Sequence, residues 1–274
     1  MTAFSAEWLA LRAAADSAAR SSRLAQLVAQ MLSAVDPIRV LDLASGTGAN
    51  VRYLSEFFPA RQEWLLVDHD RDLLDHARRQ LPSSVSHAEV RQTDLRIITD
   101  GGAAELFSGR ALVTASALLD LVSGAWLSAL ATQCSGNGSA VLFALTYDGR
   151  MQCTPEEPED ARVRDLVTQH QRSDKGFGPA LGPDAVERAE QCFTRAGYSV
   201  QRERSDWILA PEAAALQRPL IQGWADAAAE IAPDEAASIR AWCARRLAHV
   251  DALRSRIVVG HEDLAGWPGN LVIG

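Results

Sequence analysis

The stretch at residues 40–50 reads VLDLASGTGAN and indicates a buried strand followed by a turn of small residues. Residues 38–43 are almost continuously apolar, which is typical of a parallel strand covered on both faces. Gly46 and Gly48 lack a Cβ, so the backbone can turn tightly there and approach a ligand closely. The stretch therefore predicts a ligand site near residue 45. The alternative is a plain strand-turn-helix whose glycines serve only the turn.

The composition is that of a globular protein, with 47% hydrophobic and 23% charged residues. At 274 residues, the chain is expected to form a single domain, residues 1–274, with inserted segments. The formal net charge of -8 argues against a broad phosphate-binding surface, so we expect no nucleic-acid partner. No apolar run approaches the ~20 residues that span a bilayer, so we expect no membrane partner.

Four widely spaced cysteines predict reduced thiols, because no C-x-x-C pair and no histidine spacing suited to zinc accompanies them. The N-terminal residues include Glu7 and Asp16 and have no continuous apolar run, so no secretory signal is expected there. Together these features predict a cytoplasmic protein without a metal site.

Strands and helices alternate along the first half of the chain. Apolar runs predict strands at residues 38–43, 63–67, 85–91, 112–115 and 140–146, with helical spacing between them. This order implies right-handed crossovers and an α/β fold with a seven-stranded, mostly parallel, doubly wound sheet. Ligands bind to such sheets at the carboxyl ends of the strands, where the strand order reverses.

The second half of the chain has a different pattern. Residues 151–182 show little strand signal, whereas residues 198–209 and 257–259 predict the last two strands. Two long helices are predicted between residues 210 and 254. His261-Glu262-Asp263 follows the last predicted strand and is expected to be a loop and not a metal site.

Three acidic residues, Asp42, Asp68 and Asp94, fall in or just after successive predicted strands. We expect them along one rim of the sheet. Asp68 lies 20 positions after Gly48, a spacing that suits a carboxylate binding a ribose diol. NAD sites and adenosyl cofactor sites share that spacing. A dinucleotide fingerprint requires a small residue three places after Gly48, where this chain has Val51, so the pyrophosphate interpretation is weakened.

Residues 42–48, DLASGTG, resemble motif I of the class I S-adenosylmethionine-dependent methyltransferases, which reads acidic-x-G-x-G-x-G; Ala44 replaces the first glycine. The resemblance continues through LLVDHD at residues 65–70, Thr93-Asp94-Leu95, and TASALLD at residues 114–120. It covers about residues 35–147, and it implies S-adenosylmethionine as cofactor on a sheet of the class I methyltransferase type with helical lid insertions.

The resemblance also implies the role of particular residues. Asp68 is expected to bind the ribose hydroxyls, the Asp94 side chain the adenine amino group, and the next backbone N–H the adenine ring. Ala44 is expected to displace the cofactor slightly, since it adds one methyl group. The full predicted cofactor set is Arg12, Asp42, Ala44, Ser45, Gly46, Gly48, Asp68, His69, Thr93, Asp94, Leu95 and Ser116.

Within the domain, residues 1–34 are predicted as an N-terminal helical segment and residues 35–147 as the cofactor-binding core. Residues 148–182 and 210–254 are predicted to form a lid, and residues 183–209 and 255–274 to complete the sheet.

Two residues are candidates for catalysis, His170 and Asp120. His170 opens a polar loop in which Arg172 and Lys175 offer cations for an anionic acceptor, although a solvated connector would have the same composition. Asp120 follows the fourth predicted strand, where a surface charge or helix cap is equally consistent. Arg12 and Arg20 would share one helix face and reach the methionine carboxylate or the acceptor, unless they are ordinary surface arginines.

The sequence thus predicts a methyltransferase that acts on a small-molecule acceptor, as a monomer or homodimer. In-line methyl transfer depends mainly on alignment, which supplies ~7–11 kcal/mol in well-oriented systems, so a conspicuous catalytic residue is not required. Two alternatives remain at this point, an NAD-dependent oxidoreductase and a non-catalytic S-adenosylmethionine-binding protein.

Overall fold

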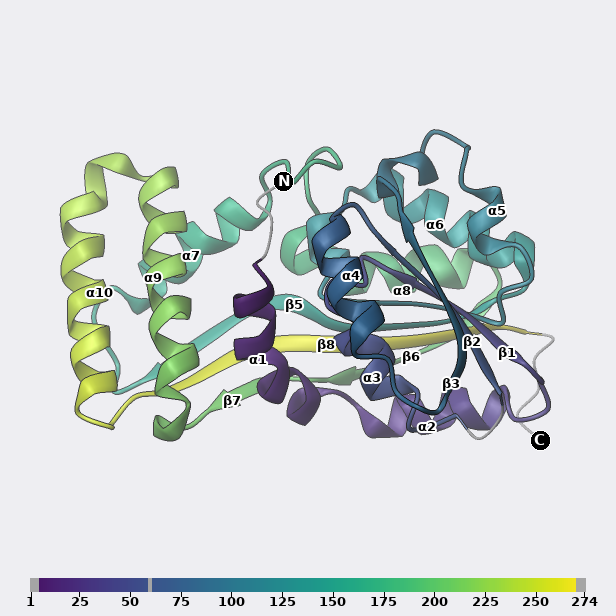
Figure 1. Ribbon diagram of the computed structural model, residues 1–274. Coiled ribbons are helices and arrows are strands. Elements are labelled where there is room, and N and C mark those ends of the chain that lie inside the picture. The colour runs from purple at the N-terminus through teal and green to yellow at the C-terminus, as the bar shows by residue number, and fades with distance from the viewer. Residues whose placement is uncertain (1–4, 59–60, 270–274) are drawn as a thin grey trace.

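The computed structural model describes residues 5–58 and 61–269, which form one sheet of eight strands between layers of helices (Figure 1). The strands lie in the order β3-β2-β1-β4-β5-β8-β6, and the short β7 pairs with β8. Their bounds are β1 Ile38–Leu43, β2 Gln62–Asp68, β3 Val85–Gln92, β4 Leu112–Ser116, β5 Ala140–Thr154, β6 Tyr198–Arg204, β7 Trp207–Leu209 and β8 Arg256–Pro268. Strands β1 to β5 pair in parallel and β8 is antiparallel to its neighbours, which confirms the predicted α/β fold with a mostly parallel sheet.

Helices cover both faces of the sheet. The α-helices are α1 Ala6–Ala19, α2 Ser22–Met31, α3 Ala49–Leu54, α4 Arg71–Arg79, α5 Ala104–Phe107, α6 Gly124–Asn137, α7 Asp160–Gln171, α8 Ala185–Arg195, α9 Ala214–Ile231 and α10 Ala236–Asp251. Short 3-10 helices are η1 Leu95–Ile98, η2 Leu119–Leu121, η3 Gly182–Asp184, η4 Pro211–Ala213 and η5 Pro233–Glu235. The described helices include none that is long and apolar enough to cross a membrane.

Side chains of β1 alternate between two apolar clusters, as the period of a strand requires. Leu41 and Leu43 pack with α5, α6 and α8 on one face, whereas Ile38 and Val40 pack with α2, α3 and α4 on the other. All four side chains are fully buried. Burial on both faces explains why the strand reads as a continuous apolar run and not as an alternating one.

The strand order reverses between β1 and β4. From β1 the chain moves outward through β2 and β3, and it then returns to the other side of β1 to add β4 and β5. The loops after β1 and β4 therefore leave the sheet in opposite directions, and a crevice opens between them at the carboxyl ends of the strands. This is where ligands bind in open α/β sheets, so the candidate site is expected there.

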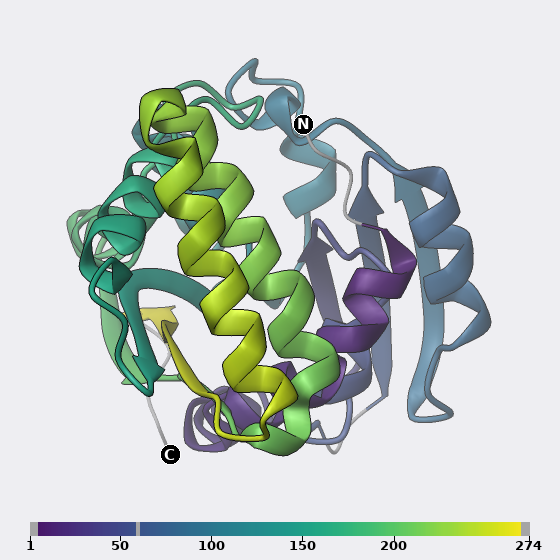
Figure 2. The ribbon, with the colours of Figure 1, turned by 90° about the vertical axis from the view of Figure 1, so that its left-hand side faces the viewer.

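Strands β5 and β8 extend beyond the parallel sheet and support a separate helical layer (Figure 1). Helices α7, α9 and α10 pack on this extension around a third apolar cluster, which includes Trp224 and Trp242. Figure 2 shows α9 and α10 side by side, with α1 lying next to α9. Residues Trp8, Ala15 and Ala19 of α1 pack against the same cluster, so α1 joins this layer to the sheet.

Three predictions about the second half are wrong. Strand β5 continues to Thr154, past its predicted end at residue 146 and into the segment predicted to have little strand signal. His261, Glu262 and Asp263 lie inside β8 and are not a loop. The buried Asp263 accepts hydrogen bonds from the backbone N–H groups of Ser21 and Leu145, so partners distant in sequence allow a carboxylate within a buried strand.

The predicted strand over residues 198–209 is instead two strands, because the chain leaves the ladder at Ser205 and Asp206. The Asp206 carboxylate binds the Arg150 guanidinium and accepts from the backbone N–H of His261. These polar contacts replace the strand pairing at that point. The predicted helices of both halves are confirmed.

Candidate functional site

A cavity of about 130 Å³ lies at the carboxyl ends of β1, β2 and β4, and we call it the main cavity. Its wall combines the turn after β1, the end of β2, the exit of β4, helix α1 and the loop after α7. The lining residues are Leu9, Arg12, Asp16, Ala44, Ser45, Gly46, Thr47, Ala49, Asn50, Asp68, His69, Leu73, Leu95, Ser116, Ala117, Leu118, Leu121, Lys175 and Phe177. Eight of the predicted cofactor residues are among them, namely Arg12, Ala44, Ser45, Gly46, Asp68, His69, Leu95 and Ser116.

The turn after β1 has three residues with positive φ. Ala44, Gly46 and Gly48 have φ angles of 52°, 51° and 77°. A Cβ on Gly46 would lie 3.2 Å from a methyl of Leu9, and one on Gly48 would lie 3.1 Å from the Cβ of Ala77. A side chain at either position would therefore be strained by the backbone conformation and crowded by these neighbours. Ala44 holds the same left-handed conformation with a Cβ present, which is strained for an alanine.

Replacing Ala44 by glycine is expected to raise the free energy of unfolding by about 0.5–1 kcal/mol, because the strain at φ 52° exceeds the extra entropy that glycine loses on folding. Urea unfolding measures this change. The control is Ala244→Gly in the exposed face of α10, where the same exchange should lower the free energy of unfolding by about 1 kcal/mol. Equal losses at the two positions would show that Ala44 is not strained.

Asp68 links the end of β2 to the turn after β1. Its Oδ2 accepts a hydrogen bond from the backbone N–H of Gly46 at 2.8 Å, and its Oδ1 accepts from the backbone N–H of Asp70 at 3.0 Å. The imidazole of His69 lies 3.1 Å from Oδ1. The carboxylate is almost fully buried, yet it lines the main cavity. Each oxygen keeps lone-pair capacity for a further donor, so Asp68 can bind a diol there.

Ser45 ties the same turn to β2 through its hydroxyl. The Oγ donates to the carbonyl oxygen of Asp42 at 2.8 Å and accepts from the backbone N–H of Val67 at 3.0 Å. The backbone N–H of Ser45 in turn donates to the carbonyl oxygen of Val67. A small hydroxyl side chain is needed here to join two strands at the point where they end.

Asp42 is fully buried beneath the turn and does not line the main cavity. Its Oδ1 accepts from the Asn50 amide at 2.5 Å, and that amide also donates to the Thr114 hydroxyl. Burial raises the pKa of Asp42 to about 7, while hydrogen bonds from Asn50 and Ser45 act in the opposite direction. Asp42 therefore holds the first turn of α3 against β1. Gly48 likewise shapes the turn without lining the cavity.

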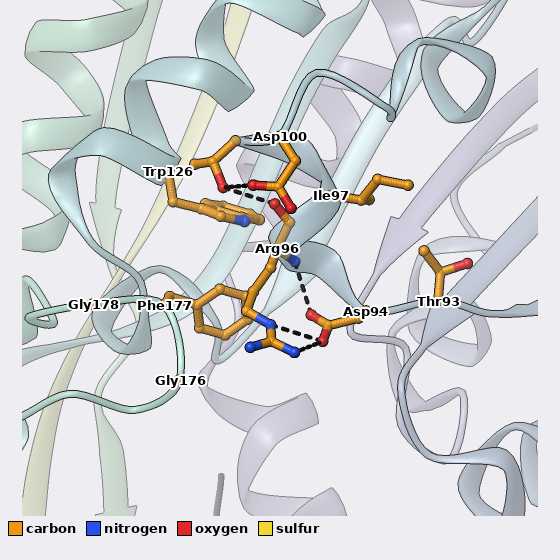
Figure 3. A pocket seen from close by; sticks show the side chains of 10 residues that line it. Thr93, Asp94, Arg96, Ile97, Asp100, Trp126, Gly176, Phe177 and Gly178 are labelled. Atoms are coloured by element: carbon orange, nitrogen blue, oxygen red, sulfur yellow. Dashed lines mark hydrogen bonds and ion pairs between the residues drawn. The ribbon is translucent and has the colours of Figure 1, made fainter.

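A second, more open cavity of about 650 Å³ lies beside the first, next to η1, and we call it the outer cavity (Figure 3). Thr93 and Asp94 line it. The backbone N–H of Thr93 donates to the carbonyl oxygen of Asp68 at 2.8 Å, which places the end of β3 beside the end of β2.

Asp94 caps η1 by accepting from the backbone N–H of Arg96 at 2.9 Å. Its other oxygen binds the Arg96 guanidinium, and Figure 3 shows the Arg96 side chain turned toward it. The side-chain hydrogen bond from Arg96 lowers the pKa of Asp94, so the carboxylate is anionic at neutral pH. Asp94 therefore acts as the N-cap of η1 and also lines the outer cavity.

Phe177 lines both cavities. Its ring packs edge-on against Trp126, with ring centroids 5.7 Å apart, and the Trp126 indole donates to the carbonyl oxygen of Leu95 at 2.8 Å. Asp174 shapes the loop by accepting from the backbone N–H groups of Gly176 and Gly178. The loop after α7 therefore carries an aromatic wall to the place where the two cavities meet.

Helix α1 closes the other side of the main cavity. Arg12 and Asp16 form a two-point ion pair one helical turn apart, with contacts of 2.9 and 3.1 Å. The Trp207 indole donates to Asp16 at 3.0 Å, and the Arg12 guanidinium stacks over the Trp207 ring at 4.9 Å. Both charges face the cavity. Arg20 is buried against the Tyr53 ring instead and does not line the cavity.

The two predicted catalytic residues lie outside the wall that the described residues form around the main cavity. Asp120 is buried in η2, and its Oδ1 has no hydrogen-bond donor among the described residues. Burial raises the pKa of Asp120 to about 6. His170 sits at the end of α7, where its two ring nitrogens contact Glu230 and Lys175. Only Lys175 of that group reaches the cavity.

No protein-family model and no curated protein matches this chain. Several solved structures are similar to it. The chain is similar to S-adenosylmethionine-dependent methyltransferases from Thiobacillus denitrificans and Geobacter sulfurreducens, both in complex with S-adenosyl-L-homocysteine. The first is 14% identical over 97% of this chain and 99% of that chain, with a TM-score of 0.47. The second is 14% identical over 98% and 100%, with a TM-score of 0.46.

A cyclopropane synthase from Mycobacterium tuberculosis is also similar, with 11% identity over 88% of this chain and 82% of that chain and a TM-score of 0.44. Identities and scores this low carry no conclusion about function. The function has to be derived from this chain's own side chains.

Several residues of the wall were not predicted as site residues from the sequence. Leu9, Asp16 and Phe177 reach the site only because α1 and the loop after α7 fold over the sheet. No local pattern around them indicates a ligand. Asn50 could have been predicted from the sequence, because it follows the glycine turn by two residues and its amide can bond to the preceding strand.

Proposed function

We propose that this protein is an S-adenosylmethionine-dependent methyltransferase that acts on a small-molecule acceptor. The observation that carries the proposal is the contact between Asp68 and the backbone N–H of Gly46 at the cavity wall. The contact places a carboxylate, which can accept hydrogen bonds from a diol, beside a turn whose backbone lines the cavity. Both lie where the strand order of the sheet reverses. An adenosyl cofactor requires both.

The side chains present fit the parts of this cofactor. Asp68 would bind the ribose hydroxyls, and Asp94 with the backbone of Leu95 would bind the adenine. Phe177, shared by both cavities, would lie along the adenosyl group. Ala44 and Gly46 of the turn line the main cavity, so their backbone would be within reach of the cofactor.

Arg12 and Asp16 suit the methionine end of the cofactor. That end is a zwitterion with one carboxylate and one ammonium group, and the α1 pair offers one guanidinium and one carboxylate at the same wall. The Arg12 Nη1 group is not used in the contact with Asp16. We infer that α1 orients the cofactor through these two charges.

When bound, the cofactor supplies an electrophilic methyl group. The chain's own residues would contribute binding, orientation and exclusion of water. Leu9 of α1 and Phe177 of the loop after α7 would cover the reacting centre, and Leu118 and Leu121 would form an apolar wall for the acceptor. Alignment of two bound molecules in this way accounts for ~7–11 kcal/mol of a barrier in favourable systems.

The packing of α3 argues against the NAD-dependent alternative. A dinucleotide site needs a small residue where this chain has Val51, so that the helix can approach the strand. Val51 is fully buried among core side chains, and its methyl would lie 3.3 Å from a Cβ at Gly48. The helix is therefore held by a branched side chain at the point where a pyrophosphate would approach.

A reducing, cytoplasmic setting is part of the proposal. All four cysteines are free and buried, at Cys134, Cys153, Cys192 and Cys243. Proteins of the oxidising compartments more often use cysteines as disulfides.

Calorimetry with S-adenosylmethionine, S-adenosylhomocysteine and NAD tests the proposal. We expect micromolar binding of the first two and no heat from NAD. Binding of NAD without S-adenosylmethionine would contradict it. In a second step, tritium from methyl-labelled S-adenosylmethionine should appear in the small-molecule fraction of a metabolite extract; binding without any transfer would favour the non-catalytic alternative.

A further inference from the structure

Lys175 is the only lysine of the chain, and every other member of its 27 Lys and Arg residues is an arginine. Lysine and arginine differ in their ability to lose a proton. An arginine stays protonated at all accessible pH values, whereas a lysine can lose its proton when its surroundings disfavour the charge. The one cationic side chain able to act as a neutral amine lines the main cavity.

Lys175 is linked to solvent through two further side chains. Its Nζ lies 3.3 Å from Nδ1 of His170, and Nε2 of the same ring lies 3.1 Å from a carboxylate oxygen of Glu230. The three residues come from the loop after α7, from α7 and from α9. Lys175 is half-buried, His170 is less exposed than Glu230, and Glu230 stands in solvent with 70% of its side chain exposed.

We propose that Lys175 is the general base that accepts the acceptor's proton, and that His170 and Glu230 conduct this proton to solvent. The inference rests on the proposed methyltransferase function and specifies the proton path at its site. His170 becomes a positioning and relay residue, because both of its ring nitrogens are occupied by these neighbours.

Methyl transfer is accompanied by loss of a proton from the acceptor, and every atom and electron pair is accounted for. The acceptor's nucleophilic atom forms a bond to the methyl carbon while the carbon–sulfur bond breaks with its electron pair left on sulfur. Neutral Lys175 takes the proton that leaves the nucleophile and becomes an ammonium. Its Nζ–H then donates toward Nδ1 of His170, while Nε2–H points toward Glu230, so one proton can leave by that carboxylate and restore the amine.

The surroundings of Lys175 favour the neutral amine. Burial lowers its pKa, and the charge of Glu230 opposes this effect. Across the cavity, Arg12 is paired with Asp16, and Asp68 is held by backbone N–H groups and His69. No carboxylate in the described part of the chain forms a direct ion pair with Lys175.

Competitive acetylation at a series of pH values tests the titration of Lys175 without any acceptor or cofactor. The protein and a free lysine-containing peptide are treated together with acetic anhydride, and mass spectrometry of the Lys175 fragment gives the midpoint. We expect a midpoint below that of the peptide. Glu230→Gln should lower it further, whereas Glu187→Gln on α8 should leave it unchanged. A midpoint at or above that of the peptide would overturn the proposal.

Lys175→Arg separates a base from a binding site for an anionic acceptor. Arginine keeps the positive charge but cannot accept a proton. We expect at least a 100-fold loss of methyl transfer with S-adenosylmethionine affinity unchanged within threefold; retained transfer would exclude the base role while the methyltransferase function stands. If S-adenosylmethionine fails to bind the wild type, the failure lies with the proposed function instead.

Discussion

Replacing Asp68 by alanine is expected to weaken S-adenosylmethionine binding by about 100-fold. Hydrogen bonds to a carboxylate contribute about 1.5–3 kcal/mol each, and the proposed diol contact has two of them. A loss of about 3 kcal/mol corresponds to about a 100-fold change in affinity. The same substitution frees the backbone N–H of Gly46, so the turn loses its anchor as well. Calorimetric titration measures the change.

Asp68→Asn provides the matched variant, since the amide oxygen can still accept from Gly46. We expect it to lose about tenfold, because it keeps the hydrogen bond from Gly46 but loses the charge and the second acceptor oxygen, which accepts from Asp70. The control is Asp72→Asn on the exposed start of α4, for which affinity should stay within twofold. If Asp68→Ala bound the cofactor as tightly as the wild type, the ribose would have to lie elsewhere.

The second large effect concerns the pH dependence of stability. Burial raises the pKa of Asp42 from 3.8 to about 7, so the folded protein holds this proton more tightly than the unfolded chain does. The stability contributed by protonated Asp42 is therefore complete below about pH 4 and is lost as pH rises to about 7. Between pH 5 and pH 8, this one group should lower the free energy of unfolding by about 3 kcal/mol.

Asp42→Asn isolates this contribution. The amide can still accept from Asn50, and it carries no titratable group. Urea unfolding of both proteins at pH 5 and pH 8 should show the wild type losing about 3 kcal/mol more than the variant. Asp120, whose pKa burial raises to about 6, changes stability in the same direction but is present in both proteins and cancels.

Asp36→Asn serves as the exposed control, because Asp36 pairs with Arg61 on the surface. Its stability should follow that of the wild type at both pH values. Parallel behaviour of Asp42→Asn and the wild type would mean that Asp42 is ionised in the fold at little cost, despite its complete burial.

Much of the fold was predictable because local pattern and tertiary environment agree. The run at residues 38–43 is apolar throughout since both faces of β1 are covered, and the glycine turn after it needs positive φ. In β8 the local pattern and the tertiary environment disagree. His261 and Asp263 have the composition of a loop, and only contacts with Ser21, Leu145 and Trp207 make them strand residues.

The carboxylates of the proposed cofactor site were also placed by local sequence. Asp68 and Asp94 follow strands whose parallel pairing brings their carboxyl ends to one rim. Asp42 lies beneath the turn and not in the cavity wall, and its hydrogen bond from Asn50 gives it a structural role. The prediction of His170 rests on a polar cluster and that of Asp120 on its place after the fourth strand, and neither pattern reports which side chain faces a cavity.

The sequence by itself determined the parallel strands β1 to β4, the glycine turn and the order of carboxylates along the sheet, because each depends on residues close together in the chain. Only the tertiary structure decided which side chains complete the site. Leu9 and Arg12 precede the sheet, Lys175 and Phe177 follow β5, and Glu230 belongs to α9. They meet because α1 and the helices carried by β5 and β8 bury their apolar faces together, a long-range effect that no local pattern records.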